Sequence, residues 1–328
     1  MTYCVGIRTQ QGLVLASDSR TNSGIDQVEV CRKMHNFVIP GERMFTILSS
    51  GSLSLTQSVM TRLDQDFRAG DGLASVTNFY EAARCVGQQV RAVGTLDREY
   101  MERDNINFSV NLLVGGQIRG EMPQLYLIYA QGNPLRCTRL SPFLQIGESK
   151  YGRPILDRGI RFGETTLDQA VTYAIISLDS TMRSNVAVGP PIDLLVYAND
   201  DLSVKRYRRL DASDPSLGEI RSSWEQALRH AIKTVPQIHF DDTPPREQLG
   251  VAFTRDAGKS VGGAGAVSDD DLVALCQELI AANPKIVADV RGGKEQAAAG
   301  LIGQAKKKNP NANPGKVRQL CLNLIKAM

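Results

Sequence analysis

The sequence predicts an α+β layered sandwich followed by a small all-α domain. Segments with strand patterns are grouped before and after two long helical stretches, so strands and helices do not alternate strictly as a doubly wound sheet requires. The composition changes after Ile238, where a stretch rich in Gly and Pro begins. Beyond that stretch the pattern is helical only, which predicts a second and smaller domain.

Strands are predicted where short runs rich in β-branched and other apolar residues are bounded by turn residues. Gln10–Gly12 separates the first two runs, and Pro40–Gly41 separates the next two. The predicted strands are Tyr3–Arg8, Leu13–Ser17, Asn36–Ile39, Met44–Ser49, Ile106–Val114, Gln124–Ala130, Leu135–Leu140, Ile192–Tyr197 and Ser203–Arg208. Apolar residues on one face predict helices at Leu53–Phe67 and Val76–Val93. Helices are also predicted at Leu167–Thr181 and Gly218–Thr234.

The chain is expected to divide into a sandwich domain at residues 1–240, a linker at 241–267 and a helical domain at 268–328. Asp242–Pro245 and Gly262–Gly265 give the linker both stiff and flexible parts.

The helical domain is predicted to begin at Ser268, which caps the first helix. The aspartates that follow it favour the positive end of the helix dipole. Asn283–Pro284 ends this helix. A short helix comes next, followed by helices at Lys294–Lys308 and Lys316–Ala327.

The composition is that of an ordinary soluble globular protein. Hydrophobic residues make up 42% of the 328 residues, charged residues make up 22%, and the formal net charge is +3. No run of 18 or more apolar residues predicts a transmembrane helix. The first residues also lack the basic start of a signal peptide. We therefore expect a cytoplasmic protein that has no membrane partner.

Metal and cofactor sites are not expected. The six cysteines form no CxxC pair and only three histidines are present, which argues against a zinc site. In the cytoplasm the thiols should stay reduced. Gly258–Ser260 ends like a phosphate-binding loop, but Phe253 stands where that loop requires glycine.

The N-terminal residues point to nucleophilic catalysis. A threonine hydroxyl needs an adjacent base, and an N-terminal threonine carries one in its own α-amine. The ordinary pKa of that amine is about 7.7–8.0, close to neutral pH. A nearby lysine cation lowers this pKa, and a carboxylate keeps the lysine charged. A backbone N–H is also needed for the oxyanion.

The sequence offers each of these parts. Thr2 follows the initiator Met, which is readily removed before a small residue. Asp18 and Arg20 come just after the second predicted strand, and Lys33 comes soon afterwards. Ser49–Ser52 ends one strand and starts a helix, so its N–H groups could form an anion-binding corner.

In this order and spacing, Thr2–Ile7 and Gly12–Arg20 are similar to the start of proteasome β-subunits. The pattern resembles Anbu, a bacterial proteasome-like family whose members begin at Met-Thr without a propeptide. Leu178–Asn185 and Gly189–Asp193 also resemble Anbu. The resemblance covers about residues 1–240 and implies the four-layer αββα sandwich of the N-terminal nucleophile (Ntn) hydrolases.

The resemblance also implies a role for each site residue. Thr2 would be both nucleophile and base once Met1 has been removed. Lys33 would lower the pKa of the amine, and Asp18 would hold Lys33. The N–H of Gly51 would receive the oxyanion. The other residues implied near the catalytic centre are Arg20, Asp179 and Ser184. The implied wall of the substrate pocket is Thr21, Cys31, His35 and Ser49.

The last domain resembles the YqeY family and the similar tail of the B subunit of tRNA-dependent amidotransferases. The matching pieces are Asn283–Lys285, Asp289–Lys294, Gly303–Gln304 and Asn313–Pro314. The amidotransferase tail contacts tRNA, so the resemblance implies RNA binding.

The charge pattern of this tail agrees with RNA binding. From Gln304 to Met328 there are six basic residues, three of them at Lys306, Lys307 and Lys308, and no acidic residue. Such a cluster can bind phosphates. The alternative is a solvated helix end, where lysines favour the helix dipole.

Three functional hypotheses follow. The first is a self-assembling, proteasome-like threonine peptidase or amidohydrolase that acts on a peptide or amide substrate. The second is a catalytically silent assembly module with a tail that binds RNA, in particular tRNA. The third is an amidase that acts on a small or tRNA-linked amide. Intact mass, which reports whether Met1 has been removed, discriminates between the catalytic and silent hypotheses.

Overall fold

The computed structural model separates the chain into two compact units, Met1–Gln237 and Ile238–Met328. The residues that the structure describes are 2–22, 28–239, 269–309 and 312–327. The predicted linker at 241–267 and the predicted cap at Ser268 lie outside them. No helix in these described ranges is long and apolar enough to cross a membrane.

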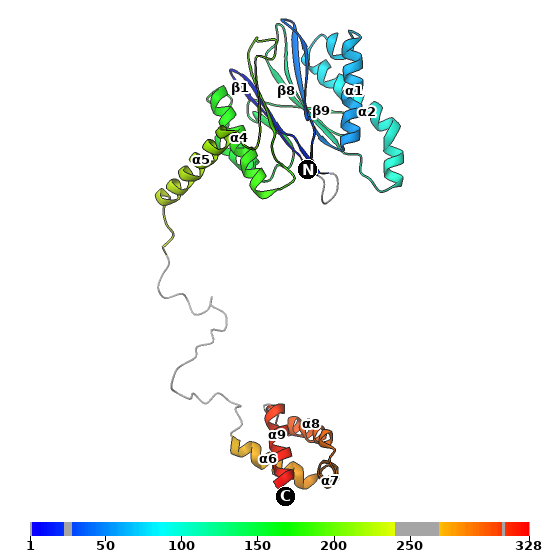
Figure 1. The fold of residues 1–328 in the computed structure, drawn as a ribbon, viewed down its shortest axis with the longest axis vertical. Helices are drawn as coiled ribbons and strands as arrows, with labels where there is room; N and C mark the ends of the chain where they lie inside the picture. Colours follow the sequence, from blue (N-terminus) through cyan, green and yellow to red (C-terminus); the bar gives the residue numbers. More distant parts are fainter. Residues whose placement is uncertain (1, 23–27, 240–268, 310–311, 328) are drawn as a thin grey trace. The chain divides into compact units, whose positions relative to one another are not determined.

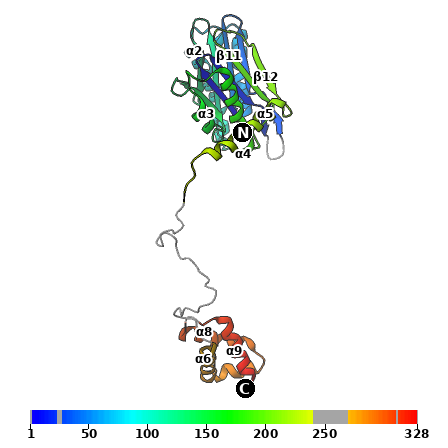
Figure 2. The same cartoon turned by 90° about the vertical axis from the view of Figure 1, so that its left-hand side faces the viewer.

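Two five-stranded antiparallel sheets form the centre of the first unit (Figures 1 and 2). The first sheet has the order β10-β1-β2-β11-β12, with bounds β10 Phe143–Gly147, β1 Tyr3–Thr9, β2 Gly12–Asp18, β11 Ile192–Ala198 and β12 Arg206–Leu210. The second has the order β5-β6-β7-β8-β9, with bounds β5 Met34–Ile39, β6 Arg43–Gly51, β7 Val110–Ile118, β8 Gln124–Ile128 and β9 Pro134–Arg136. A short hairpin joins β3 (Arg20–Asn22) to β4 (Val28–Val30).

Helices cover the outer face of each sheet. Those on the second sheet are α1 Leu53–Arg68 and α2 Phe79–Arg103, joined through the 3₁₀ turn η1 Gly72–Ala74. Those on the side of the first sheet are α3 Arg153–Gly159, α4 Leu167–Ser184 and α5 Pro215–Thr234. The layers therefore follow the order helix, sheet, sheet, helix, which confirms the predicted αββα sandwich.

Three apolar cores hold the four layers together, because the central strands are buried on both faces. In β1, Val5 packs toward α4, whereas Cys4 packs between the two sheets. In β6, Ile47 packs toward α1, whereas Leu48 packs between the sheets. Side chains of a strand alternate between its faces, so each strand contributes to two cores.

Helix α2 differs from its predicted bounds. It begins at Phe79 rather than Val76, because Asn78 caps it by accepting the Glu81 N–H at 2.9 Å. It also continues past Gly94 to Arg103, although Val93 was the predicted end. A glycine inside a helix costs about 1 kcal/mol, which the burial of this helix on the second sheet outweighs.

The segment after β8 also differs from the prediction. The expected strand Leu135–Leu140 is reduced to β9, because a turn follows in which the Ser141 N–H donates to Thr138 Oγ1 at 3.0 Å. Strand β10 and helix α3 were not predicted at all. β10 completes the first sheet by pairing with β1, and it therefore lies directly beside the N-terminal residues.

The second unit is a small helical bundle with its own core. Its elements are α6 Asp269–Ala282, α7 Pro284–Arg291, the 3₁₀ turn η3 Glu295–Ala298, α8 Ala299–Lys308 and α9 Pro314–Ala327. Leu279, Leu301 and Val317 are among the buried residues at its centre. The predicted all-α domain is thus confirmed, although the expected helix from Lys294 begins as η3.

Candidate active site

Thr2 lies directly before β1 and is held by the end of β10. Its carbonyl oxygen accepts the N–H of Glu148 at 2.7 Å. Gly147, the register partner of Tyr3, has a φ of +85°. A Cβ on Gly147 would lie 2.0 Å from the carbonyl oxygen of Thr2, which is far inside van der Waals contact. Only glycine therefore allows β10 to approach Thr2 this closely.

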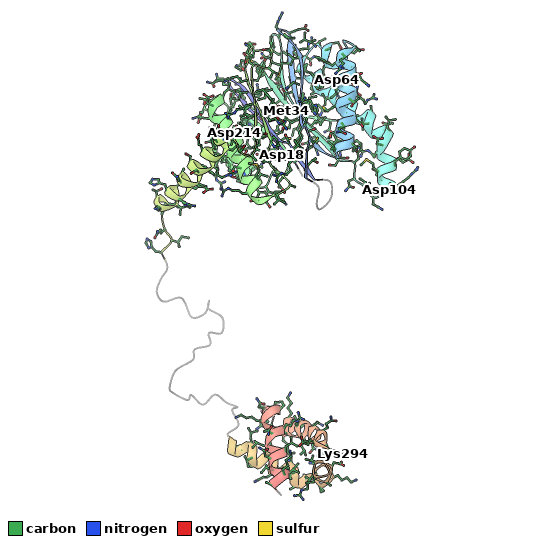
Figure 3. All side chains as sticks on the ribbon, viewed as in Figure 1. Asp18, Met34, Asp64, Asp104, Asp214 and Lys294 are labelled. Carbon is green, nitrogen blue, oxygen red and sulfur yellow. The ribbon has the colours of Figure 1, made fainter. Side chains whose placement is uncertain are left out.

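Asp18, at the end of β2, is the centre of the hydrogen-bond network beside Thr2 and lies inside the first unit (Figure 3). Its buried carboxylate accepts the N–H of Tyr3 at 2.9 Å and the N–H of Gly189 at 3.3 Å. It also accepts the ammonium of Lys33 at 2.8 Å. Burial raises the pKa of Asp18 above its ordinary value, while the Lys33 cation and these hydrogen bonds oppose that rise.

Lys33 comes just before β5 and is only 5% exposed. Its Nζ donates to Oδ1 of Asp18 at 2.8 Å and to the carbonyl oxygen of Arg20 at 2.5 Å. The same Oδ1 accepts the Tyr3 N–H, so a single carboxylate oxygen joins the ammonium to the residue after Thr2. The backbone of Lys33 is also fixed, because its carbonyl oxygen accepts the Ser49 N–H at 3.0 Å.

The side chain of Arg20 contacts the loop that carries Gly189. Its guanidinium donates to the carbonyl oxygen of Val186 at 2.8 Å and does not line the cavity at Thr2. It also packs so closely on Gly189 that a Cβ there would lie 2.5 Å from Arg20 Cζ. Because Gly189 donates to Asp18, Arg20 acts on the site by bracing the loop that carries this donor.

Gly51 forms the corner where β6 meets α1. Its φ is +115°, and a Cβ would lie 2.1 Å from the carbonyl oxygen of Ser109, so this position also requires glycine. The next residue, Ser52, donates its N–H to that same oxygen at 2.8 Å. The N-terminal end of α1 thus follows the corner directly, and the first N–H groups of a helix lack partners within the helix.

Two adjoining cavities lie at this end of the first unit. One, of about 560 Å³, is lined by Thr2, Thr21, Ser50, Gly51, Ser52, Leu53, Ser109, Asn111, Gly147 and Glu148. The other, of about 430 Å³, is lined by Cys31, Arg32, His35, Ser49, Leu53, Thr56, Gln57, Met60 and Thr61. Leu53 is common to both. Thr21 therefore lies in the cavity of Thr2, and the other three predicted wall residues lie in its neighbour.

The neighbouring cavity carries little charge. Burial lowers the pKa of His35 below its ordinary value, and the nearby Arg32 cation lowers it further. At neutral pH the imidazole is therefore uncharged. Arg32, which is exposed, is then the charged group among the residues that line this cavity.

Asp179 and Ser184, which the resemblance implies near the catalytic centre, are not among the residues that line the cavity of Thr2. Asp179 forms ion pairs with Arg221 of α5 at 2.6 Å and with Arg183 of its own helix at 3.3 Å. On the same helix it is Ser177 that reaches β1, where its Oγ accepts the Tyr3 hydroxyl at 2.7 Å. Residues two positions apart on a helix point in nearly opposite directions. Ser184 is exposed at the end of α4.

Sequence reasoning missed several residues of the site. Gly147 and Glu148 line the cavity with Thr2, and Gly189 donates to the carboxylate of Asp18. Asn185, one residue beyond Ser184, donates its side-chain amide to Glu148 at 3.4 Å. The available signal for Gly189 was a glycine close before a predicted strand, which does not identify a site by itself. Gly147 lies in β10, a strand that was not predicted.

The three lysines predicted to contact RNA lie in the second unit, in the last turn of α8. Lys306, Lys307 and Lys308 are all exposed. Lys308 also pairs with Glu278 of α6.

Comparison with known families agrees with both units. Residues 2–197 match the proteasome subunit family, and residues 261–325 match the GatB domain family. Among curated proteins, the B subunit of the aspartyl/glutamyl-tRNA(Asn/Gln) amidotransferase of Rhodopirellula baltica is 47% identical over 108 residues. That match covers 31% of this chain and 22% of the subunit, so the chain spans under a quarter of the length of this relative.

Solved structures relate the first unit to Anbu. Anbu (ancestral beta-subunit) from Yersinia bercovieri is 42% identical with a TM-score of 0.67, and the match covers 73% of this chain and 100% of that one. The helical assembly of the Anbu complex from Pseudomonas aeruginosa is 42% identical with a TM-score of 0.68, covering 75% and 99% of the two chains. With its proteasome fold and near-complete coverage of these relatives, the chain belongs to the proteasome subunit family, as a member of its Anbu group that also carries a GatB domain.

Proposed function

We propose that the protein is a threonine hydrolase that cleaves peptide or amide bonds with Thr2 after removal of Met1. The observation that carries this proposal is the Oδ1 atom of Asp18, which accepts both the N–H of Tyr3 and the ammonium of Lys33. The arrangement keeps a buried cation beside the residue that follows the nucleophile. Such a cation would lower the pKa of the α-amine of Thr2 and favour its neutral, basic form.

The proposed reaction begins with the free α-amine of Thr2 taking the proton from its own Oγ. The Oγ then attacks the carbonyl carbon of the substrate, and the N–H of Gly51 stabilises the oxyanion. As the tetrahedral intermediate collapses, the ammonium returns its proton to the leaving amine and an ester with Thr2 remains. Water, activated by the same amine, hydrolyses this ester and regenerates Thr2.

Substrate would occupy the two cavities that share Leu53. The one beside Thr2 would hold the scissile bond, and the one lined by His35 would hold a side chain of the substrate. Arg32 is the charged group at the second cavity, since His35 is neutral. We therefore propose that this cavity favours polar or acidic side chains over basic ones.

We also propose that the protein self-assembles. The Anbu complex of Pseudomonas aeruginosa forms a helical assembly. In this chain α2 exposes Leu96 and Tyr100, one helical turn apart near its C-terminal end, with 61% and 66% of each residue accessible. Large apolar side chains grouped on one exposed helix are typical of surfaces that a partner covers.

A second proposal concerns the tail, which we infer to bind tRNA through phosphate contacts. The observation in its favour is the run of exposed lysines at the end of α8. The described helices of this unit offer no aromatic side chain for stacking on bases, so affinity would depend on charge. The tail could bind tRNA whether the first unit is catalytically active or catalytically silent.

Thr2→Ala should abolish hydrolysis of a fluorogenic peptide and labelling by a threonine-reactive electrophile. The reason is that nucleophile and base belong to one residue. Thr2→Ser is the matched control, because it keeps both the hydroxyl and the amine and should retain part of the activity. Intact mass gives the state of Met1, and light scattering should report an unchanged assembly. Equal turnover by Thr2→Ala and the wild type would exclude this mechanism.

Lys33→Met should lower kcat by about 100-fold or more, the usual range for a lost acid–base contribution. Without the cation the pKa of the Thr2 amine rises, so the acidic limb of the pH–rate profile should move to higher pH. The control is Lys33→Met combined with Asp18→Asn, which leaves no unpaired buried carboxylate. The double variant should fold as the wild type does and show a smaller shift of the limb, because it also lacks the carboxylate charge that raises the pKa of the amine. An unshifted limb in both variants would contradict the proposed role.

Gly147→Ala should displace Thr2, because the new Cβ would overlap its carbonyl oxygen. A displacement of about 1 Å at a reacting group can lower kcat by about 100-fold. Gly70→Ala is the control: Gly70 also has a positive φ, of +82°, but a Cβ there meets nothing within 4 Å. Gly70→Ala should lose only the strain of its positive φ, about 1–3 kcal/mol in a thermal melt, and Gly147→Ala should lose more, because its Cβ also overlaps backbone. If both also lose the same activity, the contact with Thr2 has no role in catalysis.

Replacement of Lys306, Lys307 and Lys308 by Gln in the full chain should weaken tRNA binding and flatten its salt dependence. The slope of log K against log salt should fall by about 2–3, one for each lost phosphate contact. A charge-matched control replaces the exposed Arg153, Arg158 and Arg206 of the first unit. Fluorescence anisotropy at several salt concentrations measures the slopes. Equal slopes in the two triple variants would mean that the lysines are solvated side chains at the end of α8 and do not contact RNA.

A further inference from the structure

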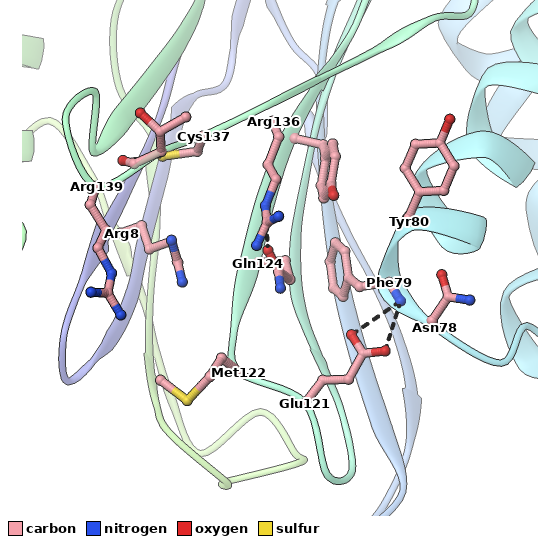
Figure 4. A pocket seen from close by; sticks show the side chains of 12 residues that line it. Arg8, Asn78, Phe79, Tyr80, Glu121, Met122, Gln124, Arg136, Cys137 and Arg139 are labelled. Carbon is pink, nitrogen blue, oxygen red and sulfur yellow. Dashed lines mark hydrogen bonds between the residues drawn. The ribbon is translucent and has the colours of Figure 1, made fainter.

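Figure 4 shows a third cavity, of about 640 Å³. Arg8 of β1 lines it, and Arg8 is six positions along the chain from Thr2. At about 3.3 Å per residue the two sites are therefore roughly 20 Å apart. The proposed hydrolysis uses no residue of this cavity, so its side chains require a separate explanation.

Arg8 is a buried cation, with only 8% of the residue exposed. Its Nε donates to the carbonyl oxygen of Pro123 at 2.9 Å, and its guanidinium lies over the ring of Phe162 at 5.0 Å. These contacts hold the side chain in place, but they supply no negative charge. A buried charge is normally paired with an opposite one.

Two more arginines converge on the same place. The guanidinium of Arg139 lies over the ring of Phe162 at 5.3 Å, so this ring is shared with Arg8. Arg136 donates its Nε to Oε1 of Gln124 at 3.1 Å. In the described part of the chain none of the three arginines is in an ion pair. Burial lowers the pKa of Arg8, and the positive charges of Arg136 and Arg139 lower it further.

The acidic residue that lines this cavity forms no ion pair with the three arginines. Glu121 directs its carboxylate to the N–H of Phe79 at the start of α2, at 3.2 and 3.3 Å (Figure 4). The cavity also lacks an activated nucleophile among its described residues, because burial raises the pKa of the Cys137 thiol to about 12. The arrangement therefore fits binding rather than covalent chemistry.

We propose that this cavity binds a small molecule that carries a phosphate or several carboxylates, held by Arg8, Arg136 and Arg139. Planar guanidinium groups bind the oxygens of such anions through paired hydrogen bonds. The volume lies within the usual range for small-molecule sites, about 300–1,000 Å³. An anion here would supply the negative charge that the described side chains around Arg8 do not.

The test is isothermal titration calorimetry of the full chain at constant ionic strength. Three probes are titrated separately: inorganic phosphate, citrate and a short peptide of glutamates. The variant combines Arg136→Gln with Arg139→Gln. Both residues are exposed, so the fold should tolerate their replacement. The control combines Arg158→Gln with Arg206→Gln, which removes the same charge from exposed positions elsewhere on the first unit.

Phosphate or citrate should bind the wild type saturably, and the variant should weaken this binding by at least about tenfold, since hydrogen bonds to charged groups are among the strongest. The control should change the affinity by less than about twofold, as expected for exposed and distant charges. The proposal is overturned if neither small anion binds the wild type, or if variant and control bind equally well. Binding of the glutamate peptide alone would also overturn it, because the surface would then contact an acidic protein segment.

Discussion

The buried pair of Asp18 and Lys33 is the interaction on which the candidate site depends. Removing two charges from water is costly, and their mutual attraction offsets that cost only when further hydrogen bonds satisfy both groups. Here Tyr3 and Gly189 donate to the carboxylate, and the carbonyl oxygen of Arg20 accepts from the ammonium. The pair therefore needs the start of β1, the end of β2, the residue before β5 and the loop before β11 in one arrangement.

This requirement explains why residues remote from the chemistry matter for the site. Glycine at 147 lets β10 close on Thr2, and glycine at 51 lets β6 turn into α1 beside Ser109. Arg20 braces the loop of Gly189, whose N–H completes the shell of Asp18. The sandwich thus brings backbone segments close together at these glycines. The positions of those segments fix the geometry of the polar side chains in the site.

Sequence patterns revealed those parts of this arrangement that are local in the chain. Thr2, Asp18 and Lys33 lie within the first 33 residues, where the resemblance to proteasome β-subunits implies a common site. The four layers followed in the same way from the order of apolar segments. Contacts across long stretches of chain could not be inferred: β10 was missed, and Asp179 was assigned to Thr2 although its position on α4 turns it toward Arg221. Helix phase decides such contacts, and a shift of two residues reverses the direction of a side chain.

The two ends of β1 show how the same physical rule leads to different functions. Near Thr2, the buried cation of Lys33 is paired with the carboxylate of Asp18, so the two charges balance without a bound ligand. At the other end, the buried cation of Arg8 has two further arginines beside it, and the nearby carboxylate of Glu121 is directed to α2 instead. Like charges gathered in a cavity do not stabilise a fold. We therefore attribute the three arginines to a bound anion that neutralises them.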